Sequence, residues 1–307
     1  ALTLVNGASI SSATIQGSTA QLNVAPSSQA TVDLVTLGSG LTANVAGSST
    51  LVATRGLTLN GSTINLNGNN STLRFDGTGE QLLAGSNGFV VGADTFQNFN
   101  GESTAITTGG TGASLRIGPG VTVRQSSTQG VGRTINVSNL SRNEGTLLME
   151  GRNSMTVSGS NWTNTGTLRA TSGTLNINGT NWSNSGTGLI DAAGGRVVLG
   201  GTWTNAGATP GTLSASTSTI AFASLVPLSN LGTYSHGSTG NYEVANGGNL
   251  DLGGGSLDVA SLGSLSLSNG GAVSNGTLLS SNPTTAQLNV APSSQATLDL
   301  VTLGSGL

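Results

Sequence analysis

The chain has 307 residues, of which 49 are glycine, only 7% are charged and only 3% are aromatic, whereas a typical soluble domain has roughly 25% charged residues. All nine basic residues are arginine and the net charge is −3, so no basic surface for nucleic acid is expected. The absence of cysteine excludes disulfides, thiolate metal sites and cysteine nucleophiles. No stretch approaches the ~18 uninterrupted apolar residues of a membrane-spanning helix. Gly, Ser, Thr and Asn outnumber the helix-forming residues, which predicts an all-β protein with short strands and many turns.

Residues 19–41 return almost unchanged near the other end of the chain. They read TAQLNVAPSSQATVDLVTLGSGL, and residues 285–307 differ from them only by Leu298 in place of Val32. Thr19 thus recurs as Thr285, and Leu41 as Leu307. The preceding segments 2–7 and 265–270 also align, with a short insertion in the second copy. Self-similarity at a fixed spacing is the sign of a repeat protein.

These copies define the expected organisation of the chain. We expect 1–18 to be the end of one repeat or linker coils, 19–284 to be one full tandem repeat of about 266 residues, and 285–307 to be the start of the next repeat. In this interpretation the chain is a window on a longer tandem array. The alternative is a complete protein whose two ends are duplicated.

Short strands are predicted after the first copy, from runs that alternate apolar, polar and apolar residues. Such runs have the period of a strand with one buried face, and most are bounded by Gly or Asn, which favour turns. They lie at 57–59, 64–66, 73–75, 115–117 and 121–123, and again at 250–252, 257–259 and 265–267.

A shorter period appears between residues 139 and 214. The tripeptide Asn-x-Gly recurs there at a regular spacing, and a Trp stands two positions before each of the last three asparagines. The motif residues are Asn143, Asn164, Asn184 and Asn205, Gly145, Gly166, Gly186 and Gly207, and Trp162, Trp182 and Trp203. A regular return of strands and glycine turns predicts a β-solenoid of about 20–21 residues per coil, in which stacked coils share one core.

An antiparallel sandwich is the competing architecture. The dipeptides Asn60-Gly61, Asn67-Gly68 and Asn269-Gly270 are typical of two-residue hairpins. A hairpin array, however, has no reason to bring Trp and Asn back at such a regular spacing. At about 4.8 Å per coil, a repeat of about 266 residues corresponds to ~12–13 coils and a length of ~60 Å.

The motif residues are expected to form structural ladders. Asn164, Asn184 and Asn205 should stack at one corner, where each amide can bond to the next. The tryptophans should stack beside them. Two interpretations of the tryptophans stay open: they fill the core, or they form an exposed flat face for a sugar or a neighbouring filament.

The chain offers few candidates for chemistry. Asp76 and Asp94, near Arg74, form the best carboxylate pair for glycoside chemistry, but isolated surface carboxylates are the simpler explanation. His236 has no evident partner for a triad or a zinc site. Residues 253–258, GGGSLD, resemble a glycine-rich calcium repeat but break its order and occur once. We therefore expect no catalytic residue, no cofactor and no metal.

Part of the chain resembles a known family. The rows from Asn139 to Ala215, with Trp-Thr/Ser-Asn-x-Gly-Thr-Leu and Gly-Thr-Leu-Asn-Ile, look like the repeats of filamentous-haemagglutinin-like and autotransporter-like bacterial surface proteins. Residues 115–124, LRIGPGVTVR, also resemble a coil of bacterial right-handed parallel β-helices. The resemblance implies secretion, a right-handed parallel β-helix, and a role in adhesion or in an extracellular fibre.

Three functions follow as expectations. The leading one is a structural repeat of a giant secreted protein that forms an extracellular filament, sheath or matrix fibre by end-to-end stacking. The partner is then the protein itself, and the location is the cell surface or the extracellular space. The second is an adhesin stalk that binds glycans or a host surface. The third is a polysaccharide lyase or hydrolase of the β-helix type.

Overall fold

The computed structural model describes residues 1–93, 103–126, 134–284 and 287–307 and shows a parallel β-solenoid. It has about 13 turns of ~22 residues, and no α-helix occurs among the described residues. The chain divides into two compact units, Ala1–Trp162 and Thr163–Leu307. Strand pairing within each unit is parallel. This overturns the antiparallel sandwich, and the Asn-Gly dipeptides serve as turns between successive strands, with Gly61, Gly68 and Gly270 at positive φ.

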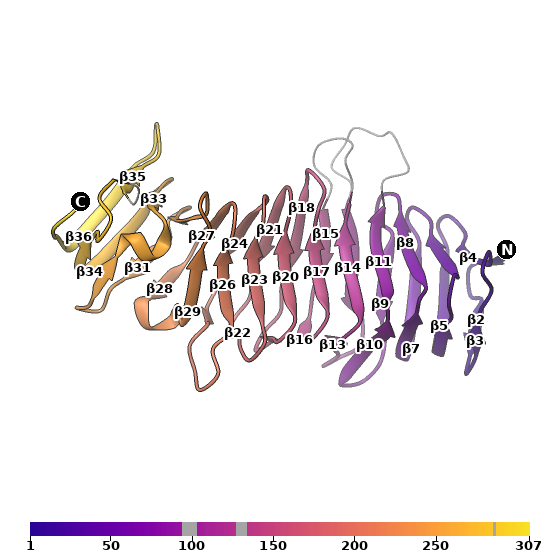
Figure 1. Ribbon diagram of the computed structural model, residues 1–307. Helices are drawn as coiled ribbons and strands as arrows, with labels where there is room; N and C mark the ends of the chain where they lie inside the picture. Colours follow the sequence, from indigo (N-terminus) through magenta and orange to yellow (C-terminus); the bar gives the residue numbers. More distant parts are fainter. Residues whose placement is uncertain (94–102, 127–133, 285–286) are drawn as a thin grey trace. The chain divides into compact units, whose positions relative to one another are not determined.

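In the first unit, one sheet takes one strand from each turn. Its order is β1 (Leu2–Leu4), β4 (Gln21–Val24), β6 (Thr42–Val45), β8 (Thr63–Asn67), β11 (Gly88–Ala93), β14 (Val121–Gln125) and β17 (Thr146–Met149). In Figure 1 the arrows of β11, β14 and β17 lie side by side and point the same way.

The other strands of the first unit belong to a second sheet, which takes up to two strands from each turn. They are β2 (Ser9–Ser11), β3 (Thr14–Ile15), β5 (Gln29–Leu37), β7 (Thr50–Asn60), β9 (Thr72–Phe75), β10 (Glu80–Ser86), β12 (Ser103–Thr108), β13 (Ser114–Ile117), β15 (Thr134–Val137), β16 (Leu140–Asn143) and β18 (Ser154–Val157).

The second unit contains strands of both kinds of sheet and adds a third. The first kind contains β20 (Thr167–Ala170), β23 (Leu189–Ala192), β26 (Thr212–Ala215) and β29 (Thr233–His236). The second contains β19 (Thr163–Asn164), β21 (Thr174–Ile177), β22 (Trp182–Asn184), β24 (Arg196–Leu199), β25 (Trp203–Thr204), β27 (Thr219–Phe222), β30 (Asn241–Val244), β33 (Leu265–Leu267) and β35 (Leu288–Val290). The third contains β28 (Leu225–Pro227), β31 (Asn249–Asp251), β32 (Ser256–Asp258), β34 (Gly271–Leu279) and β36 (Ala296–Leu303). Two short 3₁₀ helices, Leu228–Asn230 and Val259–Leu262, lie between these strands.

The core forms because apolar residues alternate with polar ones along each strand and neighbouring turns keep their register. In the first unit one interior column runs through Leu22, Ala43, Ile64, Val90, Val123 and Leu147. Each of these side chains is at most 1% exposed. Stacking in this way buries a stripe that a single turn could not bury alone.

Turn length varies more than the sequence motif indicated. Thr163 lies opposite Ser183 and Trp182 lies opposite Trp203, as the short period predicts. Phe89, by contrast, lies opposite Thr122, so the chain makes a much longer turn between them. The short period therefore holds for the segment with the Asn-x-Gly motif, and longer corners raise the average to ~22 residues.

The corners rely on left-handed residues other than glycine. Ser27, Ser48 and Asn70 have φ of 54°, 57° and 58° and lie one in each of three successive turns. Asn and Gly tolerate this backbone region best. The corner geometry thus repeats with the turn, even where the residue type changes.

Candidate functional site

The central feature of the second unit is an amide ladder formed by Asn164, Asn184 and Asn205. The Asn164 Nδ2 donates to Asn184 Oδ1 at 2.7 Å, and the Asn184 Nδ2 donates to Asn205 Oδ1 at 2.8 Å. All three side chains are fully buried. Asn143, in the first unit, is equally buried, and its Nδ2 donates to the Gly145 carbonyl at 3.3 Å.

Backbone carbonyls complete the amide ladder. Asn164 donates to Gly166 O at 3.2 Å, Asn184 to Gly188 O at 3.2 Å, and Asn205 to Leu231 O at 2.6 Å. Each side-chain amide has two N–H donors, so it can serve both the ladder and the corner. A buried amide without partners would cost free energy. Here each amide of the ladder finds its partner in the next turn, so the hydrogen bonds also join the turns.

The motif glycines lie where the corner leaves no room for a side chain or where the backbone has a positive φ. A Cβ on Gly145 would lie 2.4 Å from the Val121 carbonyl oxygen. Gly186 and Gly207 have φ of 60° and 142°. The Gly166 carbonyl takes part in the contact with Asn164 described above, so the Asn-x-Gly motif builds a corner and anchors it through the asparagine.

The tryptophans fill the core. Trp162 and Trp182 are fully buried and Trp203 is 6% exposed. The rings of Trp182 and Trp203 stack with centroids 5.4 Å apart, and Trp182 Nε1 donates to Gly200 O at 3.1 Å. The interpretation of these residues as an exposed flat face for a sugar or a filament is therefore wrong, because the rings lie inside the solenoid.

The stack of rings extends beyond the tryptophans. Phe222 lies 5.9 Å from Trp203, and Tyr242 lies 5.8 Å from Phe222, measured between ring centroids. We call Trp182, Trp203, Phe222 and Tyr242 the aromatic column. Its last two members were not expected from the sequence, although both recur close to the turn period and could have been found by that signal.

Tyr242 has a polar end inside the core. Its hydroxyl lies 2.9 Å from Ser235 O and 3.1 Å from Leu213 O, so it is held by backbone carbonyls. Burial raises the pKa of this phenol well above its ordinary value. The hydroxyl therefore stays protonated and donates, and its role in the column is to tie the ring to the neighbouring turn.

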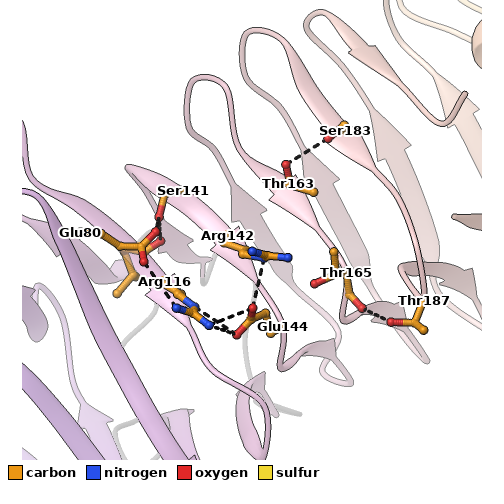
Figure 2. A network of polar contacts seen from close by, with 10 residues as sticks. Glu80, Arg116, Ser141, Arg142, Glu144, Thr163, Thr165, Ser183 and Thr187 are labelled. Carbon is orange, nitrogen blue, oxygen red and sulfur yellow. Dashed lines mark hydrogen bonds and ion pairs between the residues drawn. The ribbon is translucent and has the colours of Figure 1, made fainter. Parts of the chain in front are cut away.

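The first unit carries a charged network on its outer face, formed by Glu80, Arg116, Arg142 and Glu144 (Figure 2). Arg116 lies on β13 and donates to both oxygens of Glu144, at 3.0 and 2.8 Å through its terminal nitrogen. A second terminal nitrogen of Arg116 lies 3.7 Å from Glu80. Arg142 approaches Glu144 at 3.1 Å from the side of β16. The hydrogen bonds to Glu144 raise the pKa of Arg116 above its ordinary value, and Ser141 Oγ also donates to Glu80 at 2.9 Å, so each carboxylate of the network has partners.

Most charged side chains of the described residues take part in ion pairs of this kind. Seven arginines among the described residues form ion pairs, each with a carboxylate of its own unit. The pairs are Arg55–Asp33, Arg74–Asp76, Arg116–Glu144, Arg124–Glu150, Arg142–Glu144, Arg169–Asp191 and Arg196–Glu243. Because the pairs join residues of the same unit, the surface presents few unbalanced charges.

A polar row also runs along the outside of the first sheet. Asn44 Nδ2 donates to Asn23 Oδ1 at 2.9 Å, and Asn65 Nδ2 donates to Asn44 Oδ1 at 3.1 Å. The row borders a shallow hollow of about 380 Å³ over β4 and β6. This row was not expected from the sequence, although its three asparagines recur once per turn.

Of the candidate carboxylate pair, only Asp76 belongs to the described residues. Asp76 is bound by Arg74, with Oδ2 at 2.7 Å from the guanidinium, and Asp94 lies outside the described residues. The His236 ring nitrogens lie 2.9 Å from Gly237 O and 3.1 Å from Ala260 O. The described residues contain no group of three or more His, Cys, Asp or Glu side chains that could hold a metal ion.

The carboxylates around the glycine-rich segment 253–258 accept hydrogen bonds from backbone N–H groups. Asp251 Oδ1 accepts from Gly253 N at 3.0 Å. Asp258 Oδ1 accepts from Ala260 N at 2.9 Å and from Ser281 N at 3.1 Å, and the bonds from Ser281 contribute most to a lowered pKa of Asp258. These contacts make the segment a capped turn.

Comparison with protein families and with curated proteins finds no match for this chain. Within the described ranges, no helix is long and apolar enough to span a bilayer.

Proposed function

We propose that this chain is a structural repeat of a secreted protein that forms an extracellular filament, sheath or matrix fibre by end-to-end stacking of solenoid repeats. One observation carries the proposal: the two near-identical segments form equivalent strands, each pair within a turn of the solenoid. Residues 21–37 form β4 and β5, and their counterparts, residues 287–303, form β35 and β36. The left-handed residues also coincide, with Ser27 and Ser293 at φ of 54° and 59°.

The distribution of charge supports self-association. Two copies with few unpaired charges can approach without desolvating many of them, which would be costly. Because the arginines are paired within each unit, little long-range repulsion opposes contact between copies. The same pairing gives no field that would attract a polyanion.

The experiment is electron microscopy of proteins with one, two and three copies of residues 19–284. In each protein, residues 1–18 precede the copies and residues 285–307 follow them. We expect fibres whose length grows by ~60 Å for each added repeat, since ~12 turns rise by about 4.8 Å each. Fibre diffraction should show a reflection at ~4.8 Å along the fibre axis. Globular particles whose length does not increase with repeat number would overturn the proposal.

The extracellular location is tested separately. Antibodies against the outer face of β13 and β16 should label intact cells of the source organism without permeabilisation. Labelling that requires permeabilisation would remove the secreted location and leave the filament to be judged by microscopy alone.

A further inference from the structure

The last turn of the chain, residues 287–307, exposes side chains that its first copy buries. Val290, Leu298 and Leu303 are 55%, 42% and 53% exposed. Their counterparts, Val24, Val32 and Leu37, are at most 2% exposed. The two segments have nearly the same sequence and the same strands, so the difference comes from what lies against them.

The preceding turn meets both copies in the same way. Leu2 pairs with Leu22 in the first copy, and Leu265 pairs with Leu288 in the second. Ile10 opposes Val32 just as Val273 opposes Leu298. The turn before each copy therefore has the same register, and only the opposite side of the turn differs.

In the first copy that opposite side is covered by residues 42–60. Strand β6 pairs with β4 from Gln21↔Thr42 to Val24↔Val45, and β7 pairs with β5 from Gln29↔Thr50 to Leu37↔Leu59. The covering turn contributes side chains that are themselves at most 3% exposed, namely Ala43, Val45, Leu51, Val52, Ala53, Leu57 and Leu59. This turn is a complete apolar complement to the face.

The shape of the second copy fits such a complement. A hollow of about 310 Å³ opens at the last turn, lined by Leu288, Leu303 and Leu307 together with Gln287 and Gly306. In the first copy the corresponding leucines, Leu22, Leu37 and Leu41, are at most 1% exposed. The hollow is thus lined by the counterparts of leucines that the first copy buries.

Charge at the edge of the face is also complementary. Asp33 in the first copy accepts from Arg55 Nε at 2.8 Å and from Thr54 Oγ1 at 2.8 Å. Asp299 is its counterpart in the second copy. The chain has no arginine after Arg196, and a turn with the sequence of residues 42–60 would bring an Arg55 to this position.

We propose that the face formed by residues 287–307 is covered by a turn with the sequence of residues 42–60, which belongs to a further copy of the repeat in the same polypeptide. The incoming turn takes the register of the first copy, and its Arg55 pairs with Asp299. A separate molecule is a poor donor, because its own residues 42–60 already cover its residues 21–37. This inference rests on the proposed function and specifies the joint between repeats.

The test compares the 307-residue chain with a chain that carries residues 42–93 of the same sequence directly after Leu307. Hydrogen exchange is followed by mass spectrometry at residues 287–303 in dilute samples that sedimentation shows to be monomeric. Amides of a strand gain protection when a neighbouring strand pairs with it. We expect exchange at these residues to slow at least ~10-fold in the extended chain, and the appended residues 42–60 to be protected as well.

Matched variants change only the appended copy. Leu57→Asp together with Leu59→Asp should return residues 287–303 to the exchange rate of the unextended chain, because charges would enter the core. Arg55→Gln in the appended copy should leave most of the protection and lose a smaller part near Asp299. A variant with Thr58→Ala, which points outward between the two leucines, should behave like the unmodified extension.

Unchanged exchange at residues 287–303, with the appended residues exchanging like an unfolded chain, would overturn the inference. Protection that arises in the unextended chain as its concentration increases would also overturn it, because the occupant would then be a separate molecule. A protected joint in an array that forms no fibres would contradict only the filament. Fibres formed by arrays with an unprotected joint would contradict only this register.

Discussion

The charged network of the first unit and the amide ladder of the second unit both link successive turns, the first on the outer surface and the second in the core. Both join polar side chains of successive turns. The network lies on the outer face, where Arg116 and Glu80 are 36% and 46% exposed, whereas the asparagines of the ladder are fully buried. Water can replace a lost partner on the outside but not inside. The comparison teaches that contacts of similar length differ greatly in their value to the solenoid.

The aromatic column gives the largest expected effect. Trp182→Ala removes a buried ring that stacks on Trp203, and it should lower the free energy of unfolding by about 3–5 kcal/mol. Urea unfolding followed by circular dichroism measures the loss. Trp182→Phe keeps a ring in the column and should cost less than half as much. Equal losses for the two variants would show that the column is not packed as described.

The amide ladder comes next. Asn184→Ala leaves the Asn164 Nδ2 donor and the Asn205 Oδ1 acceptor without their ladder partner in the core, and the free energy of unfolding should fall by about 2–4 kcal/mol. The neighbouring variant Ser183→Ala is the control, because that side chain faces outward and bonds to Thr163 at 3.1 Å. Hydrogen exchange at residues 164–205 should rise in the first variant only. A neutral Asn184→Ala would contradict the value assigned to buried ladders.

The charged network should respond weakly. Arg116→Gln removes the guanidinium that joins Glu80 and Glu144, and the expected loss is at most about 1 kcal/mol, as for exposed ion pairs. The double variant with Glu144→Gln isolates the pairwise part. Raising the salt concentration should shrink the difference between Arg116→Gln and the unmodified protein. A loss as large as that of Asn184→Ala would remove the distinction between the two regions.

The smallest effect is expected at Asp33. Hydrogen bonds from Arg55 first, and then from Thr54, lower the pKa of this carboxyl from 3.8 to about 2. Because the folded pKa is lowered, the pair stabilises the fold above pH ~4 and loses its contribution as the pH falls toward ~2. The melting temperatures of the unmodified protein and of Arg55→Gln should therefore differ slightly at pH 7 and converge near pH 2. A difference that persists near pH 2 would assign it to packing of the arginine stem.

The fold could be predicted because the sequence patterns that produce it are periodic. Alternation within runs such as 115–117 indicates which residues face the core, and the return of Asn and Trp gives the turn length of the motif segment, though not that of the longer turns. The facing of the tryptophans could not be predicted, since β25 contains only Trp203 and Thr204 and is too short to show alternation. The pair Arg74–Asp76 is local and could be read from the sequence. Arg116 and Glu144 lie far apart along the chain, and their contact depends on the lengths of the corners between β13 and β16.

The direction of the backbone hydrogen bonds has a mechanical consequence. Within each unit these bonds join one turn to the next, as between β4, β6 and β8, so a pull along the stacking direction loads them lengthwise. Bonds loaded in this way separate one turn at a time. Each released turn of ~22 residues can then extend by roughly 75 Å. A stack of such turns lengthens stepwise under tension and dissipates work at each step.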